Sequence, residues 1–287
     1  MSHLSIAGLQ LELGPEDNLS TIEREIDSVK RRYPWVQMVV LPELACFGVN
    51  SKLAVQLPGE VENCFRESAM KNDIWLIPGS IYERKGDCTY NTAPVINPKG
   101  EVVARYRKQY PFLPYEKHVE NNDNFVVFDV PGIGKIGLVI CYDIWFPEII
   151  RQLTWMGAEA IIAPTLTSTI DRDIELAISQ ALAATNQVYF LGLNCAGDLG
   201  YGESIVVGPD GAIIHKAPTT RNIIAMEWDF DHVRRVRERG LLGLGQPLKS
   251  FRDAAIHYPV YQKGAGPGAY ADLGKLEIPA KEPLKSK

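Results

Sequence analysis

The chain has 287 residues, of which 46% are hydrophobic and 23% are charged, and its formal net charge is −5; these are ordinary values for a globular protein with one large domain or two small ones. No stretch approaches 18 consecutive apolar residues, no targeting signal opens the chain, and the most basic segment, residues 233–239, has its charges at helical spacing beside an acidic neighbour. We therefore expect a cytoplasmic protein that binds neither membranes nor nucleic acid.

Strand patterns and helix patterns alternate along most of the chain. The first is a strand at residues 4–13, and it is followed by a helix in which Ile22, Ile26 and Val29 fall on one face. Short apolar runs predict further strands at residues 36–41, 74–78, 126–130, 135–140, 160–164, 188–194 and 222–228. Helical patterns cover residues 60–71, 146–155, 172–186 and, as the last helix, 231–239.

Other strands are joined by tight turns. Residues 91–97 and 101–107 flank the turn Asn97-Pro-Lys-Gly100, and a similar turn, Pro209-Asp-Gly211, joins residues 204–208 to 212–216. Because helices and hairpins both connect the strands, we expect a mixed α/β fold rather than a purely parallel sheet. The composition changes to Gly- and Pro-rich at residue 263, which predicts one domain at residues 1–262 and an extended arm at 263–287.

The five cysteines are widely spaced, odd in number and free of any C-x-x-C pair, so a disulfide framework and a structural zinc site are both unexpected. The five histidines form no pair at helical spacing either, which argues against a metal centre. We therefore expect no metal and no other cofactor. The chemistry that remains is that of carboxylates, lysines and a thiol.

One cysteine, Cys141, stands at the end of a predicted strand. It follows the apolar run Ile136-Gly-Leu-Val-Ile140, and it precedes Pro147 and Glu148, which are typical of the first turn of a helix. At such a strand-to-helix junction, backbone N–H groups and a helix terminus would favour a thiolate. The alternative is a buried cysteine that acts as a small hydrophobe.

Two other ionisable residues also follow predicted strands. Glu43 comes after the run at residues 36–41, and Lys108 ends the second strand of a hairpin. Active-site groups gather at strand ends in open α/β folds. Taken singly, Glu43 could merely favour a helical turn and Lys108 could be a solvated surface lysine, so the signal lies in their combination with Cys141.

In this combination the chain resembles the nitrilase superfamily of carbon–nitrogen hydrolases, over residues 4–260. The matching blocks, in chain order, are Leu41-Pro-Glu43, Asn91-Thr-Ala93, the turn at residues 97–100, Tyr106-Arg-Lys108, the segment 137–148 and the segment 202–211. The resemblance implies a four-layer αββα sandwich with two mixed β-sheets. It also implies a homodimer or a higher homo-oligomer, with the arm lying over a partner.

The resemblance assigns roles that agree with the chemistry of these side chains. An amide carbon is a poor electrophile, so its hydrolysis needs an activated nucleophile and stabilisation of the oxyanion. Cys141 would attack, Glu43 would transfer protons, and Lys108 would neutralise the oxyanion together with the backbone N–H of Tyr142. Glu116 lies where amidase members carry a second glutamate, which would orient the lysine and accept a hydrogen bond from the substrate amide; the alternative is an exposed loop glutamate.

Two departures bear on the substrate. Trp145 stands where many amidase members have arginine, which implies an apolar pocket wall and a substrate without a carboxylate. The pair Tyr142-Asp143 favours the amidase branch, because true nitrilases more often follow the cysteine with Trp-Glu.

The leading hypothesis is therefore an amidase that hydrolyses a small, uncharged carboxamide to acid and ammonia through a cysteine thioester. The alternatives are an N-carbamoyl (ureido) amidohydrolase or a nitrilase with the same residues, an acyltransferase, and a binding protein with a degenerate site.

Overall fold

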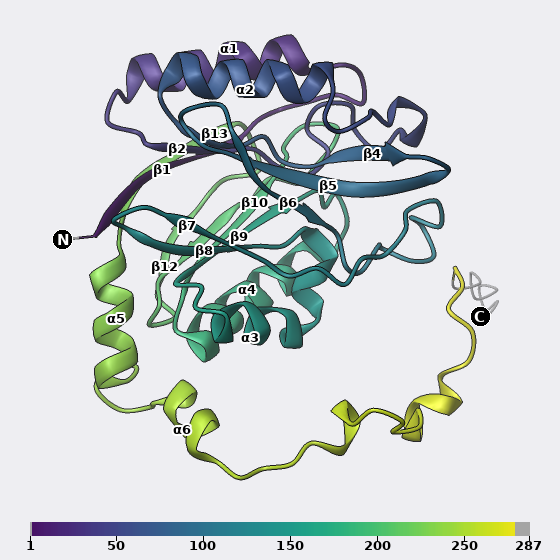
Figure 1. Cartoon of the computed structure of the whole chain (residues 1–287), viewed down its shortest axis with the longest axis vertical. Helices are drawn as coiled ribbons and strands as arrows, with labels where there is room; N and C mark the ends of the chain where they lie inside the picture. Colours follow the sequence, from purple (N-terminus) through teal and green to yellow (C-terminus); the bar gives the residue numbers. More distant parts are fainter. Residues whose placement is uncertain (1, 279–287) are drawn as a thin grey trace, which may run out of the picture.

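The computed structural model describes residues 2–278, in which two β-sheets lie face to face between two pairs of helices (Figure 1). The first sheet consists of β1 (His3–Gln10), β2 (Met38–Val40), β3 (Trp75–Ile77), β4 (Ile81–Lys85), β5 (Cys88–Ile96), β6 (Val102–Arg107) and β13 (Asn222–Asp229). The second consists of β7 (Val126–Val130), β8 (Gly134–Leu138), β9 (Ala160–Thr165), β10 (Tyr189–Asn194), β11 (Ile205–Val207) and β12 (Ile213–Lys216).

Each sheet has one outer face covered by helices. Helices α1 (Leu19–Arg32) and α2 (Glu60–Asn72) pack on the first sheet, and α3 (Pro147–Trp155) and α4 (Arg172–Asn186) pack on the second (Figure 1). This arrangement confirms the four-layer αββα sandwich with two mixed sheets.

The direction of the strands brings several strand ends to one edge. In the first sheet β1, β2 and β3 are parallel, and β6 runs the same way because two antiparallel pairings, through β5, separate it from β3. In the second sheet β8, β9 and β10 are parallel. The carboxyl ends of β2 and β6 lead directly to Glu43 and Lys108, and the carboxyl end of β8 leads to Cys141.

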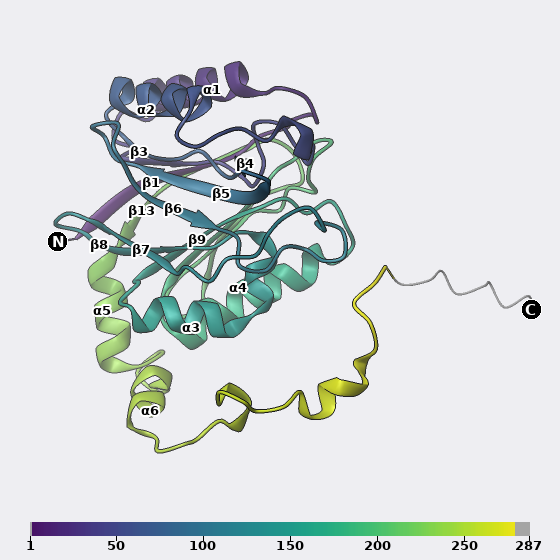
Figure 2. The same cartoon turned by 45° about the vertical axis from the view of Figure 1, so that its right-hand side comes forward.

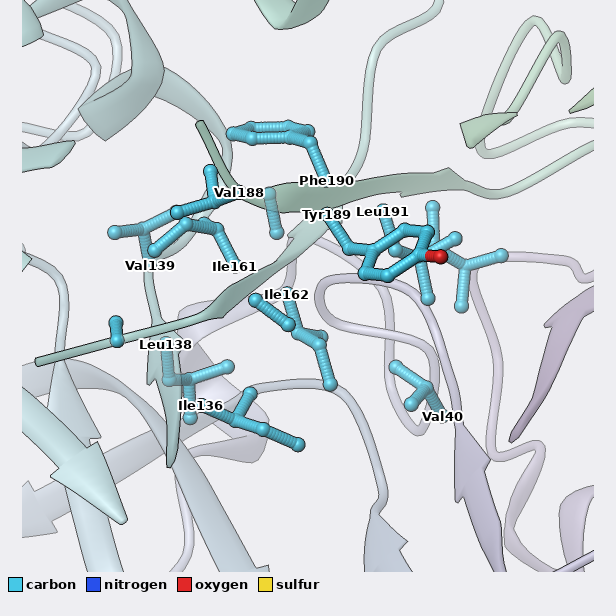
Figure 3. Packing of buried hydrophobic residues seen from close by; sticks show 14 of the residues in the cluster. Val40, Ile136, Leu138, Val139, Ile161, Ile162, Val188, Tyr189, Phe190 and Leu191 are labelled. Carbon is cyan, nitrogen blue, oxygen red and sulfur yellow. The ribbon is translucent and has the colours of Figure 1, made fainter. Parts of the chain in front are cut away.

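The main core lies between the sheets, where alternate residues of each strand meet. Val40 of β2 belongs to the same buried cluster as Ile136 and Ile162 of the second sheet (Figure 3). Its neighbour Val39 points to the opposite face, into the cluster formed with the apolar side of α1. Ile22, Ile26 and Val29 of that helix are buried, as their spacing predicts.

Two elements differ from the sequence-based expectation. Strand β4 was not expected, because three of its five residues are charged; one of them, Glu83, is nevertheless buried, since Arg107 makes two hydrogen bonds to its carboxylate. The prediction that residues 231–239 form the last helix was wrong: α5 (Phe230–Arg239) is followed by α6 (Pro247–Asp253). Helix α6 has no buried residue, so it leaves no apolar period in the sequence.

The described end of the chain leaves the sandwich (Figure 2). Residues 254–278 are exposed throughout, and Tyr261 Oη donates a hydrogen bond of 2.8 Å to Glu148 of α3. Residues 279–287 of the expected arm lie outside the described residues. The homo-oligomer stays a prediction; Trp155 on α3, with 78% of its surface exposed, is a large apolar side chain that a second copy could cover. Within residues 2–278, no helix is long and apolar enough to cross a membrane.

The packing between the sheets makes a quantitative prediction. Ile162→Ala, in fully buried β9, should lower the free energy of unfolding by about 2–5 kcal/mol, because the cavity cannot close between two sheets. The matched change Ile213→Ala, in half-exposed β12, should cost less than about 1 kcal/mol. Urea unfolding followed by circular dichroism measures both, and equal losses would contradict the proposed position of the core.

Candidate active site

Glu43, Lys108 and Cys141 lie together at the strand ends, in the space between the two sheets. All three are buried, with exposed fractions of 3%, 2% and 8%. Lys108 Nζ donates a hydrogen bond of 2.9 Å to Glu43 Oε1, and the thiol of Cys141 also interacts with the Glu43 carboxylate. The structure therefore brings together three residues from distant parts of the sequence, since Glu43 and Cys141 are 98 positions apart.

A sharp turn after β2 directs Glu43 inward. Leu41 continues the pairing with β3 through its N–H, and Glu43 then donates its own N–H across to Thr165 at the end of β9, at 3.3 Å. The following residue, Leu44, has a φ of 50°, in the left-handed region that a side chain with a Cβ rarely adopts. The turn thus ties the end of a strand in the first sheet to the end of a strand in the second.

The alternation of β6 directs Lys108 inward. Arg105 and Arg107 point to one face, where each makes two hydrogen bonds to a buried glutamate. Tyr106 and Lys108 point to the opposite face, toward the space between the sheets. Strand β6 and the residue that follows it therefore keep their three cations apart, and Lys108 is the one that reaches the candidate site.

Glu116 is the second carboxylate on Lys108, and it is 9% exposed rather than a solvated loop residue. Its Oε2 accepts hydrogen bonds from Lys108 Nζ at 2.8 Å and from the N–H of Phe112 at 2.6 Å, and its Oε1 accepts one from the Tyr82 hydroxyl at 3.2 Å. The ammonium of Lys108 is thus held between two carboxylates, as expected for a residue that orients the lysine.

Cys141 begins a short 3₁₀ turn, Cys141–Trp145, and α3 starts only at Pro147. Its φ of 47° is strained for a residue with a side chain, which is common where a functional group must be presented at a fixed angle. Its Sγ lies 3.9 Å from Thr167 Oγ1 and accepts a hydrogen bond from the N–H of Leu166. The sulfur is therefore held by the segment that follows β9.

The expectation of a resting thiolate was wrong. Burial raises the pKa of the Cys141 thiol well above its usual range, and the negative charge of Glu43 raises it further, although Lys108 opposes both effects. The helix terminus expected next to the sulfur is displaced along the chain by the 3₁₀ turn. Cys141 is consequently a neutral thiol at rest, which needs a base to become a nucleophile.

The two carboxylates on Lys108 have pKa values displaced in opposite directions. Burial raises the pKa of Glu43, and the charge of Glu116 adds to this, against the opposing effect of Lys108. Burial alone would raise the pKa of Glu116 too, but Lys108 and the surrounding donors lower it below its usual value. The carboxylates raise the pKa of Lys108 well above its usual range, although burial acts against them. Glu116 and Lys108 therefore keep their charges, and Glu43 is the carboxyl group that can exchange a proton.

Asp143 is a fully buried residue that the sequence argument used only as a branch marker. Its carboxylate accepts hydrogen bonds from the Tyr106 hydroxyl at 2.7 Å, the N–H of Ile140 at 2.9 Å and the N–H of Tyr110 at 2.9 Å. These donors belong to β6, to the end of β8 and to the segment after Lys108. Asp143 thus fixes the turn of Cys141 against the chain that carries Lys108.

Tyr142 and Trp145 belong to a partly exposed aromatic cluster beside this turn. The ring of Tyr142 lies 5.0 Å from that of Phe112, 5.4 Å from that of Phe146 and 6.2 Å from that of Trp145, between centroids. The cluster joins the Cys141 turn to the segment that ends at Glu116. Contact of Tyr142 and Trp145 with a substrate stays a prediction.

Within residues 2–278, no group of three or more His, Cys, Asp or Glu side chains is arranged to hold a metal ion. All five cysteines are free.

Comparison with known proteins gives one consistent result. A family model described as carbon-nitrogen hydrolase matches residues 5–238. A formamidase of Photorhabdus laumondii is 33% identical over 233 residues, which are 74% of this chain and 69% of that protein. A formamidase of Bacillus thuringiensis is 31% identical, with 95% of this chain and 86% of that protein covered. The crystal structure of Nit3 from Saccharomyces cerevisiae, a member of branch 10 of the nitrilase superfamily, has a TM-score of 0.76 at 26% identity, with 85% and 96% coverage.

Asp143 gives a testable pH dependence of stability. Burial raises its pKa to about 6, from an ordinary value of 3.8, so the folded chain binds this proton more tightly than the unfolded chain. The contribution of Asp143 to the free energy of unfolding is then fully present below its pKa in the unfolded chain. It is lost as the pH rises through its pKa in the folded chain. The free energy of unfolding of the wild type minus that of Asp143→Asn should fall by about 2 kcal/mol between pH 4 and pH 7, since one pKa unit is ~1.4 kcal/mol and part of the contribution is already lost at pH 4.

Urea unfolding of both proteins at matched pH values measures this difference, and the variant itself corrects for the other carboxyl groups. A difference that is constant with pH, or that grows as the pH rises, would show that Asp143 is ionised without cost in the folded state.

Proposed function

Since the chain belongs to the carbon-nitrogen hydrolase family, within the nitrilase superfamily, and is a hydrolase of carbon–nitrogen bonds, we propose that it is an amidase that converts a small, uncharged carboxamide to a carboxylic acid and ammonia. The observation that carries the proposal is the buried contact of the Lys108 ammonium with two carboxylates beside the thiol of Cys141. The pKa of one carboxylate, Glu43, is raised, and the pKa of the other, Glu116, is lowered. A fixed charge, a proton carrier and a nucleophile are the groups that amide hydrolysis requires.

In the first half of the proposed reaction Glu43 takes the proton of the Cys141 thiol while the sulfur attacks the carbonyl carbon. The carbonyl oxygen becomes an oxyanion, which Lys108 and the backbone N–H of Tyr142 stabilise. Protonated Glu43 then gives its proton to the amide nitrogen, the carbon–nitrogen bond breaks, and ammonia leaves. The acyl group remains on the sulfur as a thioester.

In the second half, water takes the place of the amine. Glu43 accepts a proton from the water as its oxygen attacks the thioester carbon, and Lys108 again stabilises the oxyanion. The carbon–sulfur bond breaks, the sulfur recovers the proton from Glu43, and the carboxylic acid leaves. Each cycle returns Cys141 to the neutral thiol and Glu43 to the carboxylate, so no cofactor is consumed.

Glu116 explains how one lysine can serve both halves. Its lowered pKa keeps it ionised, so it holds the Lys108 ammonium in place while Glu43 changes its protonation state. Its position beside Lys108 also suits it to accept a hydrogen bond from the NH₂ group of an amide. A nitrile has no such group to donate, which favours an amide substrate over a nitrile.

The charges of the site support an uncharged substrate. Two carboxylates already surround the single ammonium, so a substrate carboxylate would meet excess negative charge in a region with little water. The partly buried indole of Trp145 adds an apolar surface beside the turn. A small substrate is supported by the two bacterial relatives, which are formamidases.

The proposal predicts the outcome of a substrate panel. The wild type should release ammonia from formamide, acetamide and propionamide faster than from the matched nitriles and ureas. Cys141→Ala should lower kcat at least about 10³-fold, and Glu43→Gln nearly as much, because the two residues act as a unit. A coupled ammonia assay measures each rate.

Cys64→Ala is the matched control, since Cys64 lies on α2, outside the candidate site, and its removal should leave kcat unchanged. Turnover retained in Cys141→Ala would exclude this cysteine as the nucleophile. A wild type that prefers the nitriles, or the ureas, would assign the same residues to one of the alternative reactions instead.

A further inference from the structure

Asn91 is a fully buried polar residue that the reaction described above does not use. It lies in β5, and its Nδ2 donates a hydrogen bond of 2.8 Å to Glu43 Oε1. Lys108 Nζ donates to the same oxygen at 2.9 Å. Two donors thus converge on one oxygen of the carboxylate, which leaves the other oxygen, Oε2, for proton exchange with Cys141 and the substrate.

The main chain of Asn91 makes a second connection to the site. Its carbonyl oxygen accepts the N–H of Lys108 at 2.9 Å, directly beyond the last paired residues of the β5–β6 hairpin. One residue therefore fixes the backbone of Lys108 and the side chain of Glu43 at the same time. Glu43 and Lys108 arrive from different strands, so Asn91 sets the distance between them.

The Oδ1 atom of Asn91 indicates that a hydrogen-bond donor is required next to Glu43. This oxygen is buried and has no hydrogen-bond partner among the described residues. The amide cannot be reversed to satisfy it, because Oδ1 would then face the Glu43 carboxylate. A buried acceptor without a partner destabilises a protein, and a leucine, which has the same branching and the same number of side-chain heavy atoms, would avoid that cost. Packing alone does not account for an asparagine at this position.

We propose that Asn91 is a positioning residue that orients the Glu43 carboxylate and favours its charged form, so that Oε2 faces the Cys141 thiol as the base. The role as base rests on the function proposed above, whereas the contact between Asn91 and Glu43 does not. By this account Asn91 touches no substrate, and it acts on the rate only through Glu43.

Two substitutions test the proposal through the pH profile. Asn91→Leu keeps the branching and the number of side-chain heavy atoms but removes the donor. Since a hydrogen bond to the charged form lowers a carboxyl pKa, its loss should shift the acid limb of the kcat profile to higher pH by about one unit. The value of kcat at its optimum should fall about tenfold or more, with KM changed little. Asn91→Asp keeps the shape and adds a negative charge next to Glu43. The acid limb of its kcat profile should therefore shift to higher pH by at least as much as in Asn91→Leu.

Asn186→Leu is the matched control. Asn186 is also buried, and its Oδ1 too lacks a hydrogen-bond partner within residues 2–278. Its Nδ2 donates to the Leu182 carbonyl and the Thr185 hydroxyl within α4. Its replacement should lower the stability without moving the acid limb. If folded Asn91→Leu or Asn91→Asp has the acid limb of the wild type, or a lower one, the proposal is overturned.

A second measurement needs no substrate. The rate at which iodoacetamide alkylates Cys141 in the full chain depends on proton transfer to Glu43, so its acid limb should rise in both Asn91 variants and stay in place in Asn186→Leu. A wild type that hydrolyses no amide, with this shift present, would reject the proposed function and retain the role of Asn91. If the wild type hydrolyses amides but neither the kcat profile nor the alkylation profile shifts in the Asn91 variants, the proposed function stands and the role of Asn91 is rejected.

Discussion

The buried ammonium of Lys108 is the constraint on which the rest of the site depends. A charge removed from water is stable only when opposite charges and hydrogen bonds replace its hydration, and here the two carboxylates of Glu43 and Glu116 do so. The replacement is unequal. Glu116 has further donors on both of its oxygens and a lowered pKa, whereas Glu43 has a raised one. That inequality divides the site into a fixed ion pair and one carboxyl group that can carry a proton.

The two sheets contribute different chemical groups, and a few contacts keep them in register. The first sheet supplies the charged groups, from the ends of β2 and β6, and the second supplies the thiol, from the end of β8. The N–H of Glu43 donates a hydrogen bond to the carbonyl of Thr165 in the second sheet. Asp143, in the turn of Cys141, accepts a hydrogen bond from the hydroxyl of Tyr106 in the first sheet. Burial of the site is a consequence of this design, because the space between two packed sheets holds little water. The same burial keeps the Cys141 thiol neutral and makes a base necessary.

Much of this could be predicted from the sequence, and the failures have identifiable causes. The periods of the apolar residues predicted most strands and helices, and strand ends located Glu43, Lys108 and Cys141. The ionisation of Cys141 could not be predicted, because it depends on burial and on charges that are distant in the sequence. Asn91 could not be paired with Lys108 from the sequence, because counting back from the turn at residues 97–100 places it opposite Arg107, and a bulge between Val95 and Ile96 shifts the register of the hairpin by one residue. Strand β4 was missed because its buried charge, Glu83, is satisfied by contacts with Arg107 and Thr92 of other strands.

The central claim is that hydrolysis proceeds through a thioester from which the amine has already left. The most direct test supplies the amide and the methyl ester of the same acyl group, with hydroxylamine present beside water, and measures the ratio of hydroxamic acid to carboxylic acid formed. A common thioester predicts the same ratio from both substrates, because hydroxylamine and water then compete for one intermediate. A ratio that changes with the leaving group would contradict the account, since water would then attack while the amine or alcohol is still bound.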